Sequence, residues 1–154
     1  MGLYFEEFKV GEVFKTKSRT VTEADIVMFS GLSGDYNALH TNEEYAKKTE
    51  HGTRIAHGML VLSIATGLMY PLGITDETGI GFLGINEFKF LKSVKANDTI
   101  RVELKISEKR ESKSRNDAGI IMREISILNQ KDELVQRGIF AILMKKKSTT
   151  CNIN

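Results

Sequence analysis

Two side chains that can transfer protons, Asp35 and His40, lie five residues apart in the turn-rich segment 34–40. A regular helix would place them on different faces, whereas a loop lets both converge on one point. A carboxylate and an imidazole that converge on a water molecule form an acid/base pair, in which one group takes a proton from water and the other delivers one to carbon. The Asn37 amide between them can hold a water or orient an acid. Spacing alone nevertheless favours an ordinary turn, because Gly, Asp and Asn are common turn residues.

A glycine at the start of an apolar stretch, Gly58, is a second candidate. The first N–H groups of a helix have no partner within it, so a carbonyl placed there would be polarised and a developing enolate stabilised. Considered alone, Gly58 more simply permits tight helix packing. His57 could act as a ligand or a base, but its position favours a helix-entry residue. Thr66, two turns further on, could bond a backbone carbonyl or face a water at a substrate.

Composition narrows the class of protein. The chain has 154 residues, of which 41% are hydrophobic and 27% charged, and this predicts one domain with a packed core. The net charge is only +2, and basic and acidic residues are interspersed. That pattern lacks the one-sided basic surface that nucleic-acid binding requires.

Signals for export, membrane insertion and metal binding are absent from the sequence. The N-terminus lacks the basic-then-apolar pattern of a signal peptide. The longest apolar stretch, 55–72, is broken by polar residues, whereas a membrane span needs about 20 mostly apolar ones. Cys151 is the single cysteine, so it allows neither an internal disulfide nor a cysteine pair for zinc. We expect a soluble cytoplasmic protein without a metal.

The two halves of the chain differ in their hydrophobic period. The first half predicts a strand over 13–21, a helix that Thr22 and Asp25 cap and that Gly31 and Gly34 end, and a short helix over 41–46. A helix over 58–70 is apolar on nearly all sides, which predicts that protein surrounds it. The second half predicts strands with short connections, hence an antiparallel sheet, over 84–91, 100–107, 121–128 and 134–144. We expect an α+β domain over 1–147, its sheet curled around the apolar helix, and a frayed tail over 148–154.

The segments FSGLSGDYNALH (29–40) and IAHGML (55–60) together resemble the MaoC-like dehydratases, which include the (R)-specific enoyl-CoA hydratases. The resemblance covers most of the chain, from FKVGE (8–12) to VKANDT (94–99) and the strands beyond. It implies a hot-dog fold, in which a long curved antiparallel sheet wraps a central helix, and assembly into dimers or larger homo-oligomers. The family usually has proline where this chain has Ala38, and alanine stiffens the loop less.

The resemblance implies a hydro-lyase of fatty acid metabolism. The reaction is syn hydration of a trans-2-enoyl-CoA to an (R)-3-hydroxyacyl-CoA, and its reverse, with no cofactor beyond the coenzyme A that the substrate carries. The implied catalytic residues are Asp35 and His40, with Asn37 orienting the water, and the Gly58 backbone N–H forms the oxyanion hole. The implied substrate-binding residues are Thr66, His57, Met59 and Met69.

The sequence allows two other functions. The chain could act on acyl carrier protein rather than coenzyme A, because both present the same pantetheine arm; a hot-dog thioesterase would lack the segment 35–40. The chain could also be a non-catalytic acyl-CoA-binding module, because a fold does not fix a function. Such a module would not need Asp35, Asn37 and His40 together.

Overall fold

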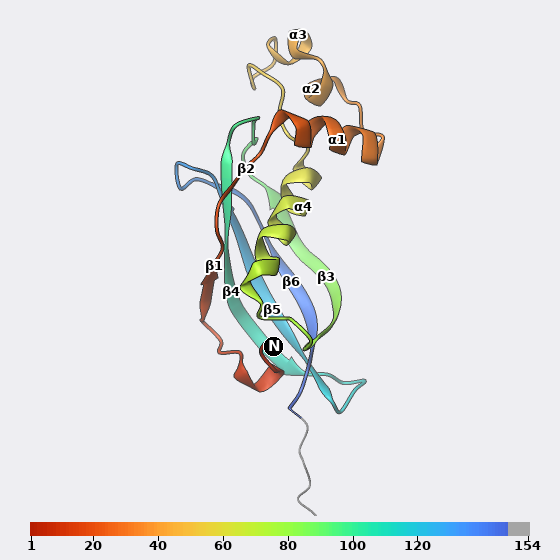
Figure 1. Cartoon of the computed structure of the whole chain (residues 1–154), viewed down its shortest axis with the longest axis vertical. Helices are drawn as coiled ribbons and strands as arrows, with labels where there is room; N and C mark the ends of the chain where they lie inside the picture. Colours follow the sequence, from red (N-terminus) through yellow and green to blue (C-terminus); the bar gives the residue numbers. More distant parts are fainter. Residues whose placement is uncertain (148–154) are drawn as a thin grey trace, which may run out of the picture.

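A computed structural model describes residues 1–147, and its main feature is a curved antiparallel sheet that wraps one helix (Figure 1). The strand order is β1-β4-β5-β6-β3, and the short β2 pairs with β4. This confirms the predicted α+β class and the sheet around a helix. The predicted frayed tail, 148–154, lies outside the described residues. The strands are β1 (Val13–Lys15), β2 (Arg19–Thr20), β3 (Gly79–Phe90), β4 (Thr99–Glu111), β5 (Ala118–Leu128) and β6 (Leu134–Lys145).

The candidate site residues lie in or next to helices. Helices α1, α2 and α3 lie together at one end of the sheet, whereas α4 lies along the sheet (Figure 1). The predicted capping box of the first helix is present, with Thr22 Oγ1 accepting from the Asp25 N–H. Gly31 lies inside that helix, which corrects the prediction that it helps to end it; Gly34 alone does so, in a left-handed conformation with φ 75°. The helices are α1 (Glu23–Ser33), α2 (Ala38–Thr41), α3 (Glu43–Ala46) and α4 (Gly58–Met69), with 3₁₀ turns at Phe5–Glu7 and Tyr70–Leu72.

The predicted strands differ from the observed ones mainly in length. The strand expected over 13–21 is interrupted at 16–18, where the Thr16 hydroxyl accepts a hydrogen bond from the Val102 N–H. This hydrogen bond to a side chain takes the place of a backbone hydrogen bond between the two strands. The hydrophobic period of the sequence does not reveal such an interruption. The strand expected over 84–91 begins earlier, at Gly79, and its pairing with β6 contains three register shifts. β3 also forms one edge of the sheet.

The core lies between α4 and the inner face of the sheet. The alternating apolar residues of β4, from Ile100 to Ile106, are fully buried, as their period of two predicts. The buried face of α4 comprises Leu60, Val61, Leu62, Ile64 and Ala65. The opposite side of α4 is exposed along a stripe, so the prediction that protein surrounds this helix is wrong for the single chain. This exposed stripe consists of Met59, Ser63, Thr66, Gly67 and Tyr70. None of the described helices has the length and apolar character of a membrane-crossing segment.

Stability should depend on the sheet layer beneath α4. Ile125 on β5 is fully buried, so Ile125→Ala should lower the free energy of unfolding by about 2–5 kcal/mol through lost burial and a residual cavity. Val27→Ala is the matched control, because Val27 is a β-branched residue that is 57% exposed on α1, and its change should stay within about 0.5 kcal/mol. Urea unfolding measures both, and equal losses would contradict the placement of the core.

Candidate active site

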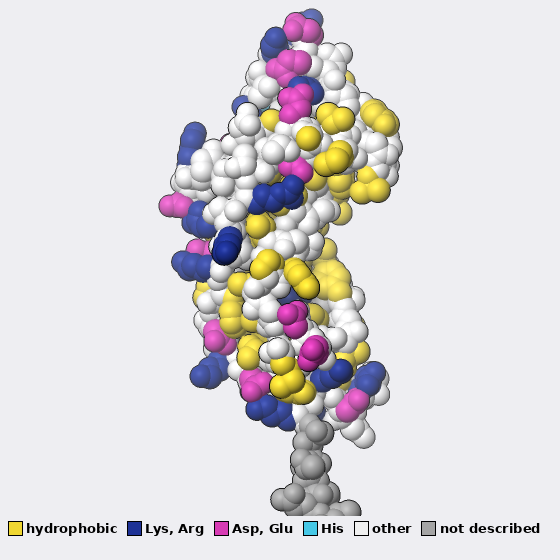
Figure 2. All heavy atoms as spheres, viewed as in Figure 1, with side chains coloured by type: hydrophobic (Ala, Val, Ile, Leu, Met, Phe, Trp, Pro, Cys, Tyr) yellow, Lys and Arg dark blue, Asp and Glu magenta, His cyan; other side chains and the backbone are white. Residues whose placement is uncertain are grey.

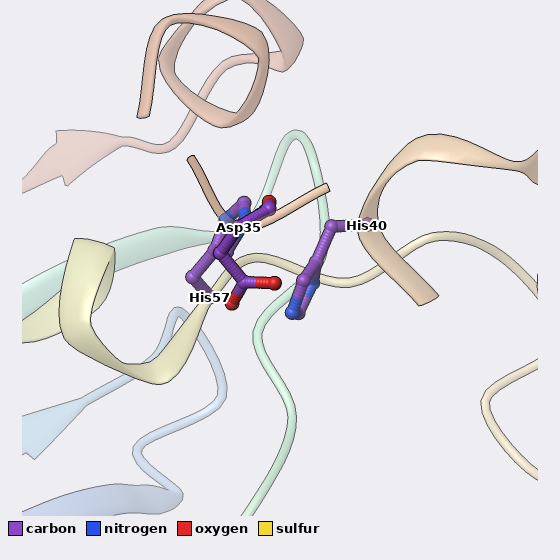
Figure 3. Close-up of side chains that lie close together, drawn as sticks. All are labelled: Asp35, His40 and His57. Carbon is purple, nitrogen blue, oxygen red and sulfur yellow. The ribbon is translucent and has the colours of Figure 1, made fainter. Parts of the chain in front are cut away.

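Three polar side chains meet where α1 ends, α2 lies and α4 begins (Figure 3). Asp35 follows α1, His40 lies in α2, and His57 precedes α4. One ligand atom from each lies within 4.8 Å of the others. The two imidazole rings stack, with centroids 3.7 Å apart and an interplanar angle of 28°. The structure therefore brings Asp35 and His40 together as predicted, and adds His57 to the same cluster.

His40 is held by a backbone carbonyl. Its Nδ1 lies 2.7 Å from the Ile55 oxygen, which can only accept, so Nδ1 carries a hydrogen and donates it. This bond is available to both the neutral and the charged ring. Nε2 is therefore the atom left to exchange a proton. The short helix α2 places His40 here, whereas the sequence indicated a loop.

His57 holds the loop that carries Asp35. The ring is only 3% exposed, and its Nε2 donates to the Asp35 backbone oxygen at 3.0 Å. The Ser30 hydroxyl lies 3.4 Å from the same nitrogen. Its Nδ1 is buried without a hydrogen-bond partner among the described residues. As the residue before α4 it is a helix-entry residue, as its position predicted, and its contacts position the Asp35 loop.

Asn37 organises the turn between the two candidate acid/base groups. Its side-chain oxygen accepts from the Leu39 N–H at 3.0 Å and caps α2. Its backbone N–H donates to Asp35 Oδ1 at 3.2 Å. The backbone of Asn37 thus orients the carboxylate, and its side-chain amino group remains available to a water. Ala38 is the first residue of α2, a position where proline also fits, so the Asn37 cap supplies local order that the missing proline would give.

Gly58 is the first residue of α4, directly after His57. A Cβ built on it would lie 2.6 Å from the Phe90 ring, so close packing against this ring requires glycine here. The Gly58 carbonyl accepts a hydrogen bond from Gln136 Nε2 at 2.9 Å. Gln136 is buried on β6 and fixes the first turn of the helix. The Gly58 N–H faces the end where the helix dipole is positive.

A cavity of about 390 Å³ adjoins Gly58. Its walls include Ile55, the residue whose carbonyl binds His40, and Met59. Asp35 and His40 do not line it, but Ile55 does, and its carbonyl oxygen lies 2.7 Å from His40 Nδ1. The sequence did not point to the cavity's polar side chains, which are those of His51, Lys92, Ser93 and Gln136.

Thr66 and Met69 lie away from this cluster. They line a second cavity, of about 270 Å³, under the C-terminal half of α4. The Thr66 hydroxyl donates to the Ser63 backbone oxygen at 2.7 Å. This is one of the two roles that its position in the sequence allowed, a hydrogen bond to a backbone carbonyl. Eight residues of helix rise about 12 Å, so Thr66 does not reach the acid/base pair of its own chain. That Thr66 contacts a substrate stays a prediction.

The cluster of Asp35, His40 and His57 has the donor atoms of a metal site. The His40 Nδ1 and His57 Nε2 atoms are, however, engaged with backbone oxygens. A metal would have to bind His40 through Nε2 and His57 through its buried Nδ1. That the protein needs no metal stays a prediction.

A charged network holds the α2–α3 segment on the rest of the molecule. The Glu43 carboxylate accepts from the Thr53 hydroxyl at 2.9 Å and from Arg54 Nε at 3.1 Å. Arg54 also pairs with Glu23 on α1. The hydrogen bonds from Thr53, and then those from Arg54, keep the pKa of the Glu43 carboxyl below its ordinary value of 4.5. Since α3 follows directly on α2, this network steadies the element that carries His40.

Comparison with known proteins places this arrangement in a family. The model of the MaoC-like domain matches residues 6–124. The chain belongs to the MaoC-like domain family. Over 106 residues it is 39% identical to Protein MaoC of Klebsiella aerogenes, covering 69% of this chain but only 31% of that protein. Over 105 residues it is 37% identical to the (R)-specific enoyl-CoA hydratase of Rhodospirillum rubrum, covering 68% of this chain and 69% of the enzyme.

Solved structures share the fold of this chain. A monoamine oxidase regulatory protein from Archaeoglobus superposes with a TM-score of 0.89 at 37% identity, over 96% of this chain and 97% of the other. A Mycobacterium tuberculosis protein described as a double hotdog fold, RV0216, superposes with a TM-score of 0.82 at 16% identity, over 96% of this chain and 46% of the other. The latter likeness concerns the fold alone, and it confirms the predicted hot-dog fold.

The Glu43 network should make the stability of this MaoC-like domain depend on pH. A carboxyl whose pKa is lowered by folding stabilises the folded state above its unfolded pKa, and this contribution is lost as the pH falls through the folded pKa. Glu43→Gln should therefore be less stable than wild type above pH 4.5, and the difference should shrink as the pH falls below that value through the lowered pKa of Glu43.

Glu44→Gln is the matched control, because Glu44 pairs only with Lys47 across an exposed helix turn. Urea unfolding at a series of pH values measures both variants. A stability difference for Glu43→Gln that does not change with pH would contradict the network.

Proposed function

We propose that this MaoC-like domain is an (R)-specific enoyl-CoA hydratase that also catalyses the reverse dehydration. The observation that carries the proposal is the His40 ring, held at Nδ1 by Ile55 and facing the Asp35 carboxylate beside the first turn of α4 (Figure 3). The printed activity of the Rhodospirillum rubrum relative supports the same reaction class. Acyl carrier protein in place of coenzyme A would leave this chemistry unchanged.

The thioester carbonyl would sit at the start of α4. There the Gly58 N–H donates to the carbonyl oxygen, and the positive end of the helix dipole stabilises the enolate that forms when water adds. The bond from Gln136 to the Gly58 carbonyl holds this turn in place. Phe90, packed on the same glycine, closes one side of the carbonyl site.

The acid/base pair would bind and activate the water. Asp35 and His40 hold one water molecule, whose oxygen forms a bond to C3 as its O–H bond breaks. One member of the pair takes that proton and the other supplies a proton to C2 on the same face, so the pair ends with the protons it started with. Because Nδ1 of His40 is bonded to Ile55 throughout, the proton passes through Nε2. The same steps in reverse release water from an (R)-3-hydroxyacyl thioester.

Removing either member of the pair should abolish most of the activity. Asp35→Asn and His40→Ala should each lower kcat for crotonyl-CoA hydration by about 10²–10⁴-fold, because each removes one proton transfer. Absorbance of the enoyl thioester follows the reaction, and chiral analysis of the product checks the (R) configuration.

Asp132→Asn is the matched control for Asp35→Asn. Asp132 lies in the β5–β6 hairpin at φ 61°, a conformation that asparagine also tolerates, and it pairs with Arg101. Its kcat should equal that of wild type. Circular dichroism verifies the fold of each variant, and normal hydration by both Asp35→Asn and His40→Ala would refute the assignment.

Assembly into a homodimer is part of the proposal. β3 ends the sheet, so one side of this strand has no neighbouring strand among the described residues. Its Phe82 and Leu83 side chains are more than half exposed, as are Met59 and Tyr70 in the exposed stripe of α4. Figure 2 shows hydrophobic side chains distributed over this face of the molecule. A second copy would cover these apolar groups.

A charge on β3 should therefore weaken the dimer. Leu83→Lys should shift sedimentation toward the mass of one chain, because a lysine in an apolar contact must be desolvated without a partner. Val13→Lys places the same charge on β1, at the opposite edge of the sheet, where Val13 is 47% exposed. This control should sediment like wild type. A wild-type protein that sediments as one chain at all concentrations would refute the dimer.

A further inference from the structure

A buried cation, Arg123, lies on the inner face of the sheet. Its neighbours across the ladder are Ile106 on β4 and Phe140 on β6, both buried. Arg123 itself is only 7% exposed. The position alternates with solvent-facing residues along β5 and is one where an apolar side chain is expected. The sequence gives no sign of this burial, because an arginine within a strand is typical of a solvent-facing position.

Arg123 has no counter-charge in the part of the chain that the structure describes. It takes part in none of the described ion pairs, and its Nε is buried without an acceptor. Burial, with no contribution from an acidic neighbour, lowers the pKa of Arg123 to about 10. The group thus stays charged at neutral pH. A buried charge without a partner is costly, so its presence points to an anion that is not part of this chain's described residues.

The guanidinium borders the cavity of about 270 Å³ under the C-terminal half of α4. This volume lies below the usual range for a drug-sized ligand and suits the end of a chain rather than a nucleotide. Most of the walls are apolar, so they would exclude a strongly hydrated group except at the cation. The principal wall residues besides Arg123 are Thr66, Met69, Phe82, Phe140 and Ile142.

A row of aromatic rings connects this cavity with the one beside Gly58. This phenylalanine row begins at Phe90, which touches Gly58, and continues to Phe88 with ring centroids 5.3 Å apart. Phe88 lies 6.2 Å from Phe140, and Phe140 lies 5.3 Å from Phe82, both at the second cavity. Along α4 the same path from Gly58 to Thr66 is about 12 Å. Apolar rings in mutual contact therefore lie between the carbonyl site and the cavity that Arg123 lines.

We propose that Arg123 binds a carboxylate at the far end of the acyl chain, so that this domain selects acyl thioesters of dicarboxylic acids. The inference rests on the proposed function for the position of the thioester at Gly58. The methylene chain lies along the phenylalanine row, and the terminal carboxylate forms the charge-assisted, two-pronged pair that guanidinium favours. A span of about 12 Å calls for a medium-length chain rather than a four-carbon one.

Binding of saturated thioesters tests the inference without any turnover. Calorimetry would compare sebacoyl-CoA with decanoyl-CoA, and adipyl-CoA with hexanoyl-CoA, because the members of each pair differ only in the terminal carboxylate. Wild type should bind sebacoyl-CoA at least about tenfold more tightly than decanoyl-CoA, since a hydrogen-bonded charge pair replaces an unpaired buried cation. The preference should be smaller for the shorter pair.

Arg123→Met removes the charge while keeping an apolar stem of similar reach, and it should reverse the preference in favour of decanoyl-CoA. Arg123→Lys retains a cation and should keep part of the preference, and it serves in place of Arg123→Met if that variant does not fold. Equal selectivity in wild type and Arg123→Met would overturn the inference. So would a change in sedimentation of Arg123→Met without a change in acyl selectivity, because the missing anion would then belong to a second copy of the chain.

The hydratase proposal and the Arg123 proposal can be refuted independently of each other. Because saturated thioesters cannot be hydrated, a lost dicarboxylate preference leaves the hydratase assignment intact. Conversely, a protein that prefers sebacoyl-CoA but hydrates no enoyl thioester would refute the reaction and retain the Arg123 subsite.

Discussion

Burial of the apolar face of α4 against the inner face of the sheet fixes where the first turn of that helix lies. Leu60, Val61 and Ala65 are almost completely buried against strands that are themselves held in long antiparallel ladders. Interiors of this kind are close-packed, so the helix has little freedom to slide or tilt. The packing of α4 therefore also fixes the positions of Gly58, its first residue, and of His57, which precedes it. The candidate site depends on this contact, because His57 in turn holds the loop that carries Asp35.

The acid/base pair is positioned by backbone groups rather than by other charged side chains. His40 bonds the Ile55 carbonyl, and Asp35 accepts from the Asn37 N–H. Backbone carbonyls and amides keep their hydrogen-bonding character at every pH, so these contacts survive a change in protonation of the pair. The charged network around Glu43 lies further out and holds the segment as a unit. In the proposed reaction, the hydrogen bonds that orient Asp35 and His40 would therefore persist while the pair exchanges protons.

Three features lack, among the described residues, the partners that protein interiors normally supply. The exposed stripe of α4 and the free edge of β3 leave apolar surface and backbone groups uncovered. The Arg123 side chain places a positive charge inside the core without a counter-charge among the described residues. Local rules of burial are most often broken at functional positions, where a ligand or a second subunit completes the contact. Under the two proposals, a second copy of the chain covers the stripe and the strand edge, and the carboxylate of a ligand pairs with Arg123.

Periodicity and local capping chemistry were enough to predict the α+β class, the buried alternation of β4 and the Thr22–Asp25 capping box, because each depends on neighbouring residues. The hot-dog fold and the choice of Asp35 and His40 as the candidate pair came from the resemblance of two short motifs to the MaoC-like dehydratases. Tertiary structure alone decided the stacking of His57 on His40, the packing of Phe90 on Gly58, and the removal of Thr66 from its own chain's acid/base pair. It also decided that Arg123 faces inward without a partner. The reason is that these contacts join residues far apart in sequence, and their geometry depends on how the helices and strands pack around one another.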